Sequence, residues 1–189
     1  MSTIALQRWS RSAAAVMVVI CVAVTCGAAS AQPRYGLSDD AYKLFAQWLN
    51  SSCVGDEAQK LGESLLHYRA PLALAFEKAL VDGPPPDEVR AVRAAAVERY
   101  AGRAKFPLDN YRIEGVSKED LARFAHVTSE EYVNDQVSRF TTGYRANAAA
   151  ALAIVGGGEA RALLARIAAD KDDPAAAAAA EALRNMPRQ

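Results

Sequence analysis

The feature that most constrains the fold is a long run of apolar residues at helical spacing between residues 128 and 156. It opens with Thr128-Ser129-Glu130-Glu131, which is typical of a capping box at the start of a helix. Apolar residues then recur every three or four positions, at Val133, Val137, Phe140, Tyr144, Ala148, Ala151, Leu152 and Val155. Gly156-Gly157-Gly158 ends the pattern. The spacing predicts one long helix between Thr128 and Gly156.

Shorter segments with the same spacing fill much of the remaining chain. Ser38-Asp39-Asp40 supplies residues preferred at a helix N-terminus, and an apolar stripe follows it. Further helical segments follow Asp56, Pro71, Pro86, Glu159 and Ala175, with Asp87-Glu88 placing acids in a first turn. No strand-like alternation is present in the sequence, and alanine, the best helix former, is abundant. We expect an all-α fold with one domain over residues 32–189.

The helix starts recur at even intervals along the chain. They lie near Asp40, Pro86, Glu130 and Pro174, with gaps of 46, 44 and 44 residues. A period of about 40–47 residues with paired helices is typical of HEAT- or armadillo-type arrays, in which stacked neighbours bury the apolar face that one pair cannot bury alone. The spacing therefore predicts helix pairs that stack consecutively.

The chain resembles the HEAT-repeat family most clearly over residues 144–186. The resemblance lies in Tyr144 to Gly156, Glu159 to Leu164 and Asp170 to Leu183, with a second patch in 71–82 and 89–96. It implies a short array of antiparallel helix pairs. Residues 106–117 interrupt the array, and residues 35–70 match only by period. An irregular orthogonal helical bundle is the alternative.

Charge and cysteine content exclude several classes of protein. The chain of 189 residues has 22 Lys+Arg and 22 Asp+Glu, which disfavours nucleic-acid binding. Cysteine is too scarce for a disulfide scaffold, with Cys53 the single thiol beyond residue 31. We interpret Cys53 as a small buried hydrophobe, with an intermolecular disulfide or a reactive thiol as the alternative.

Residues 1–31 have the parts of a secretory signal peptide. Arg8 and Arg11 provide the positive start, Ala13 to Val24 the apolar core, and Ala29-Ser30-Ala31 the small-residue cleavage pattern. Cleavage would leave Gln32 as the first residue, with no stable membrane span and a periplasmic or secreted location. An uncleaved anchor is the alternative, because residues 12–33 carry no charge and can cross a ~30 Å hydrocarbon core.

Few residues form patterns typical of catalysis or metal binding. Glu63 and His67 are four positions apart and so share a helix face, but a metal site needs three or four ligands and no other Cys or His lies nearby in sequence. We interpret the two as an ordinary surface pair. The usual nucleophile, phosphate-loop, zinc-protease and haem-attachment motifs are absent from the sequence, so no catalytic residue and no cofactor is predicted.

The aperiodic segment around residues 107–116 is the candidate binding element. It carries Phe106, Tyr111, Arg112 and Ile113, and Tyr and Arg are residue types that dominate the energetics of interfaces. The alternative is that these aromatic residues fold back onto the helix array. We expect a non-enzymatic scaffold that binds a protein of the cell envelope. A small helical enzyme or ligand-binding domain with a pocket between helices is the alternative function.

The signal-peptide prediction is tested by the N-terminus of the exported protein. Mass spectrometry should give a chain that begins at Gln32, because the small residues Ala29 and Ala31 fit the signal peptidase pattern. A chain that retains residues 12–33 would contradict cleavage and indicate a membrane-tethered protein.

Overall fold

The structure is a computed structural model that describes residues 35–51, 56–103 and 126–187. Within these ranges all regular structure is helical, as the sequence predicted. The elements are α1 (Asp39–Leu49), α2 (Asp56–Leu65), the 3₁₀ turn η1 (Leu66–Tyr68), α3 (Arg69–Asp82), α4 (Pro86–Arg103), α6 (Ser129–Val155), α7 (Gly158–Ala169) and α8 (Ala176–Asn185).

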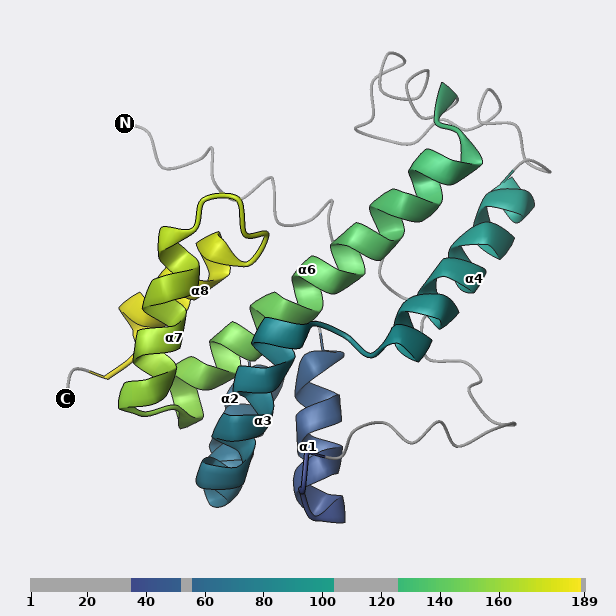
Figure 1. Cartoon of the computed structure of the whole chain (residues 1–189). Helices are drawn as coiled ribbons and strands as arrows, with labels where there is room; N and C mark the ends of the chain where they lie inside the picture. The colour runs from purple at the N-terminus through teal and green to yellow at the C-terminus, as the bar shows by residue number, and fades with distance from the viewer. Residues whose placement is uncertain (1–34, 52–55, 104–125, 188–189) are drawn as a thin grey trace, which may run out of the picture.

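Helix α6 runs through the whole molecule and is the common partner of the other helices (Figure 1). It has 27 residues, which at 1.5 Å per residue gives a length of about 40 Å. Its most extensive contacts are with α3 and α4, and it also packs against α1, α2, α7 and α8. Because α6 is so long, several shorter helices can lie side by side along it.

The core lies around the C-terminal half of α6. This half buries Tyr144, Ala148, Ala149, Ala151, Leu152, Ala153 and Val155. Its neighbours contribute large side chains that are fully buried, among them Leu65, Leu72, Phe76, Leu80 and Leu164. Small residues on several sides of α6 let these neighbours approach closely, which is how one helix accommodates several partners.

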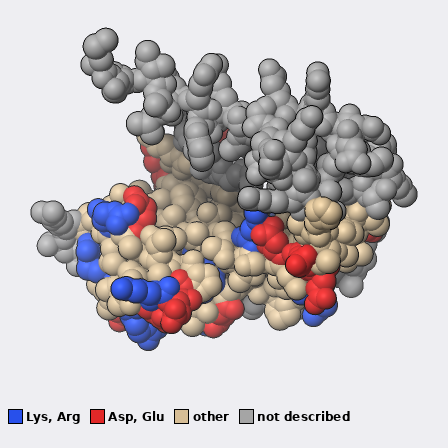
Figure 2. Space-filling model, turned by 90° about the horizontal axis from the view of Figure 1, so that it is seen from above, with Lys and Arg blue, Asp and Glu red and all other residues tan. Residues whose placement is uncertain are grey.

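The N-terminal half of α6 pairs with α4 to form an arm that leads away from the core (Figure 1). In this arm the rings of Tyr100 and Tyr132 lie 5.7 Å apart, and the Tyr100 hydroxyl donates to the carbonyl of Val127 at 2.9 Å. Ala96 of α4 and Val133 of α6 are buried. Seen from above, the visible charged side chains lie toward the α7–α8 end and the α4 end, with a largely uncharged surface between them (Figure 2).

Helix boundaries follow the capping signals in the sequence. The capping box at the start of α6 is confirmed, since the Thr128 hydroxyl accepts from the N–H of Glu131 and the Glu131 carboxylate accepts from the N–H of Thr128. Gly156 ends α6, and its N–H donates to the carbonyl of Leu152 at 2.9 Å. Helix α8 begins at Ala176, after a turn in which Asp173 Oδ1 accepts from the N–H of Ala175.

Two arginines connect helix ends that are distant in sequence. Arg69 Nε and Nη2 each donate at 3.0 Å, to the carbonyls of Val155 and Gly156 at the end of α6. A cation is favourable there because of the helix dipole. Arg145 Nε donates to the carbonyl of Leu80 at 2.7 Å, and its Nη2 lies 2.8 Å from Asp173 Oδ2. The hydrogen bond from Arg145 holds the pKa of Asp173 below its usual value.

The consecutive stacking of helix pairs is not confirmed. Helices α1 and α2, and helices α7 and α8, pack as consecutive pairs, but α3 and α4 each pack mainly on α6. The HEAT-repeat resemblance therefore stays a prediction, as does the alternative bundle. The predicted signal peptide, its cleavage site at Ala31 and Gln32, and Cys53 lie outside the described residues. Among the described helices, none has the length and apolar character needed to cross a membrane.

The turn between α6 and α7 should not tolerate a side chain at Gly156. A Cβ at Gly156 would lie 2.5 Å from the Cβ of Ala160 and would also collide with the carbonyl oxygen of Leu152. Gly156→Ala should therefore lower the free energy of unfolding by about 1–3 kcal/mol, measured by urea denaturation, because the closely packed turn has to shift.

Gly158→Ala is the matched control two residues away. A Cβ there meets nothing within 4 Å, and Gly158 already lies in the first turn of α7. We expect this variant to be neutral or stabilised by about 0.4–1 kcal/mol. Equal losses of stability in the two variants would contradict the packing explanation.

Candidate functional site

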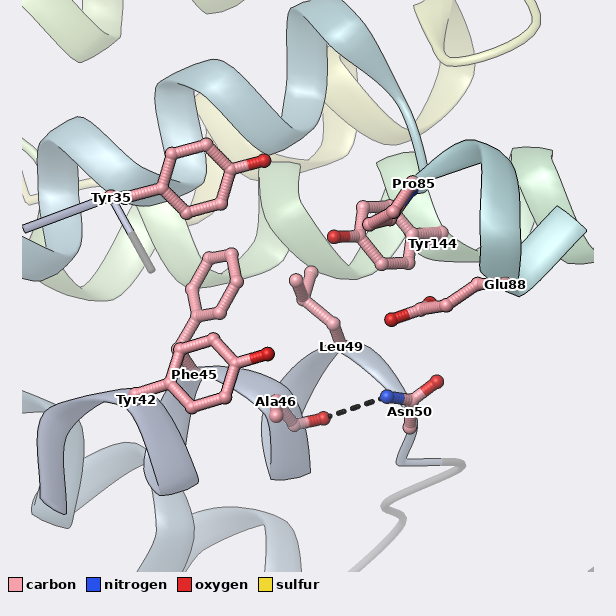
Figure 3. Close-up of a pocket in the computed structure, with 9 residues that line it drawn as sticks. All are labelled: Tyr35, Tyr42, Phe45, Ala46, Leu49, Asn50, Pro85, Glu88 and Tyr144. Atoms are coloured by element: carbon pink, nitrogen blue, oxygen red, sulfur yellow. Dashed lines mark hydrogen bonds between the residues drawn. The ribbon is translucent and has the colours of Figure 1, made fainter. Parts of the chain in front are cut away.

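A small hollow lies where the first turn of α4 meets α1 and α6 (Figure 3). We call it the tyrosine pocket, and its lining residues are Tyr35, Tyr42, Phe45, Ala46, Leu49, Asn50, Pro85, Glu88 and Tyr144. The helical spacing of α1 puts Tyr42, Phe45 and Leu49 on adjoining parts of one helix surface. The free volume is about 10 Å³, which is room for one group the size of a water molecule.

Phe45 organises the aromatic wall of the tyrosine pocket. Its ring centroid lies 5.4 Å from that of Tyr35, 6.3 Å from that of Tyr42 and 5.0 Å from that of Phe76. Such offset and edge contacts stabilise aromatic clusters beyond the area that they bury. On another side, Lys78 Nζ lies 5.8 Å from the centroid of the Tyr35 ring, within cation–π range. The wall is therefore held in place by packing.

The polar groups of the pocket point toward the same space. Figure 3 shows the hydroxyls of Tyr35, Tyr42 and Tyr144 and the carboxylate of Glu88 directed inward from separate elements. Tyr144 is only 4% exposed. The Asn50 amide lies at the edge and donates to the carbonyl of Ala46 at 3.0 Å. The pocket thus combines one acid with three phenols.

Burial determines the electrostatics of these groups. Desolvation raises the pKa of Glu88, and the neighbouring charge of Asp87 adds to the effect. Desolvation also raises the pKa of Tyr144, followed by the effects of Glu88, Tyr35 and Tyr42. For Tyr35, burial raises the pKa first, and the charges of Asp82 and Glu88 raise it further. The pocket therefore disfavours additional negative charge.

A second and larger hollow is a groove formed by α1, α6 and α8, with room of about 320 Å³. We call it the alanine groove, and its lining residues are Trp48, Ala146, Ala150, Ala153, Ile154, Ala178, Glu181, Ala182 and Asn185. Helix α2 approaches the groove closely at Gly62, where a Cβ would lie 3.3 Å from Ile154 Cδ1. Alanines that recur along α6 and α8 make the floor shallow and apolar.

A hydrogen-bonded clamp holds Trp48 at the wall of the alanine groove. Its indole Nε1 donates to the carbonyl of Asn147 at 2.7 Å. The Asn147 side chain in turn donates to the carbonyls of Leu49 and Ser51, both at 3.0 Å. The tryptophan ring is thus held in one orientation by contacts within the chain.

Of the site residues predicted from sequence, the two that the structure describes line neither hollow. Glu63 and His67 are exposed and line neither one, and Glu63 accepts a hydrogen bond from Gln59 at 3.1 Å. No group of three or more metal-binding side chains occurs in the part of the chain that the structure describes. The predicted binding residues Phe106, Tyr111, Arg112 and Ile113 lie outside that part.

Sequence reasoning did not predict that Glu88 lines the tyrosine pocket. From the sequence, Glu88 is a first-turn acid favoured by the helix dipole. The structure confirms that it lies in the first turn of α4. Its proximity to Tyr35, Tyr42 and Tyr144 depends on packing between segments that are distant in sequence.

Comparison with known proteins finds no match to this chain among family models, curated proteins or solved structures.

Removal of the Glu88 charge should stabilise the protein at neutral pH. Because the pKa of Glu88 is raised on folding, the fold favours its protonated form. Below the ordinary pKa of 4.5 the side chain is protonated in both states, and the cost of its charge appears as the pH rises through the raised value. Glu88→Gln should therefore unfold at higher urea than the wild type at pH 7, with the difference vanishing toward pH 4.

Glu98→Gln on the same helix is the control, because Glu98 is exposed. It should leave the urea midpoint nearly unchanged across this range. A Glu88→Gln variant that is less stable than the wild type at pH 7 would contradict the desolvation argument.

Proposed function

We propose that the protein is a non-catalytic scaffold that binds another protein through the alanine groove. The observation that carries the proposal is the groove itself, an apolar concavity of about 320 Å³ with a preorganised tryptophan at its wall. Preformed apolar concavities with a few polar groups are typical of binding sites. Tryptophan is also among the residue types most enriched in binding hot spots.

The shape of the groove favours an amphipathic helix as its occupant. Its floor consists of Ala146, Ala150 and Ala153 on α6 and of Ala178 and Ala182 on α8. Small floor residues allow larger apolar side chains of a partner to enter between two helices. Ala150 is exposed at the floor, whereas Ala182 is 3% exposed beneath it. We infer a partner helix with apolar residues spaced three or four positions apart.

The charge of the groove favours a basic residue beside that apolar stripe. Among the lining residues Glu181 is the single ionisable side chain, and it is exposed. Hydrogen bonds from Arg184 and then Asn185 lower the pKa of Glu181, so its carboxylate remains charged at neutral pH. Glu181 already forms an ion pair with Arg184, so a Lys or Arg of the partner would share its carboxylate.

The signal peptide predicted over residues 1–31 supports an envelope location for this binding. Export would place the domain in the periplasm or outside the cell, and its partner would be a protein of the same compartment. The segment with Phe106, Tyr111, Arg112 and Ile113 remains a second predicted contact. The tyrosine pocket favours the alternative of ligand binding, because it brings polar groups from several helices together.

A defined peptide can test the groove directly. In a Trp9→Phe background Trp48 is the single tryptophan, so its fluorescence reports on the groove. A designed amphipathic helix with a leucine stripe and one lysine should change this emission in a saturable way. Ala150→Glu should weaken binding by tenfold or more, because it places a charged side chain in the apolar floor.

Ala165→Glu provides the matched control, since Ala165 is also an exposed helical alanine but lies on α7 outside the groove. It should bind the peptide like the parent protein. A peptide with serines in place of the leucines should not bind. The proposal fails if the leucine peptide leaves the emission unchanged, or if Ala150→Glu and Ala165→Glu bind it equally.

A further inference from the structure

We infer that the tyrosine pocket is a binding site for a primary ammonium group. The pocket gathers one carboxylate and three phenol oxygens around a space that three helical elements enclose. Carboxylate and phenol oxygens accept hydrogen bonds, and an ammonium group has three donors to offer.

The size of the space selects this kind of cation. Its free volume of about 10 Å³ holds one group the size of a water molecule. The head of a primary amine has that size, whereas a guanidinium or a quaternary ammonium is larger. The ring contacts of Phe45 with Tyr35, Tyr42 and Phe76 hold the wall in place, so expansion of the pocket would disturb the aromatic cluster.

The pocket opens to solvent on one side. Phe45 and Leu49, each 3% exposed, and the nearly buried Tyr144 form its floor. Asn50 is exposed, and Tyr35, Tyr42, Pro85 and Glu88 are partly exposed around the entrance. An ammonium group can therefore approach from solvent and meet the Glu88 carboxylate without unfolding of a helix.

Competition within the chain limits the expected affinity. Tyr42 and Glu88 also interact with other groups of the protein, and an ammonium group has to share or replace those contacts. Lys78 already lies over the Tyr35 ring. We therefore expect a dissociation constant in the millimolar range for a free amine. The ammonium could come from a small amine or from a lysine side chain of another protein.

Methylammonium chloride is the probe that tests the site, with sodium chloride used to keep the ionic strength constant. Amide chemical shifts of the full chain, followed by NMR, should change in a saturable way near Tyr42, Glu88 and Tyr144. Glu88→Gln should weaken the binding at least tenfold, because it removes the charge that pairs with the ammonium. Tetramethylammonium should not produce the same shifts, because it does not fit.

Glu98→Gln is the matched control and should bind methylammonium like the wild type, since Glu98 does not line the pocket. Circular dichroism verifies that both variants are folded. A short peptide with one lysine, compared with its acetyl-lysine form, distinguishes the two sources: binding of the lysine form supports a protein side chain, and binding of methylammonium alone supports a free amine. The inference is overturned if methylammonium causes no saturable shifts, or if Glu88→Gln binds it equally well.

Discussion

Close packing against the alanine-rich half of α6 is the interaction on which the other elements depend. Ala148, Ala149 and Ala151 are fully buried there, and the neighbouring helices bring large residues such as Phe76 and Leu72 against them. A larger side chain at these positions would separate α6 from several helices at once. The polar ends of the helices add directional contacts, since Arg69 and Arg145 reach the terminal carbonyls of α6 and α3.

The tyrosine pocket and the alanine groove both depend on the packing of several helices against α6. At 100° per residue, Tyr144 and Ala146 lie on nearly opposite sides of α6. Tyr144 is part of the tyrosine pocket, and Ala146 begins the floor of the alanine groove. The hollow beside Tyr144 is thus lined by aromatic residues and by Glu88 of α4, whereas the hollow beside Ala146 is lined mainly by small apolar residues. Such different surfaces suit different chemistry, a cation on one side and an apolar helix on the other.

Local features of the fold were predictable from the sequence, because caps and apolar spacing act within a few residues. The start of α6 at its capping box, its end at Gly156 and the first-turn acids of α4 are all confirmed. The choice of packing partners was not predictable, since alanine stripes fit many helices equally well. The candidate sites depend on that choice: Glu88 meets Tyr42 and Tyr144 only through tertiary packing. Sequence spacing drew attention instead to Glu63 and His67, which line neither hollow.

Asn147 gives α1 a single rotational setting. Its carbonyl accepts a hydrogen bond from the Trp48 indole. Its side-chain amide donates to the carbonyls of Leu49 and Ser51 at the end of α1. Because Trp48 lines the groove while Leu49 lines the pocket, a turn of α1 about its axis would displace both walls in one movement. The two concavities therefore share α1 as a wall, and the hydrogen bonds of Asn147 fix the position of that wall for both.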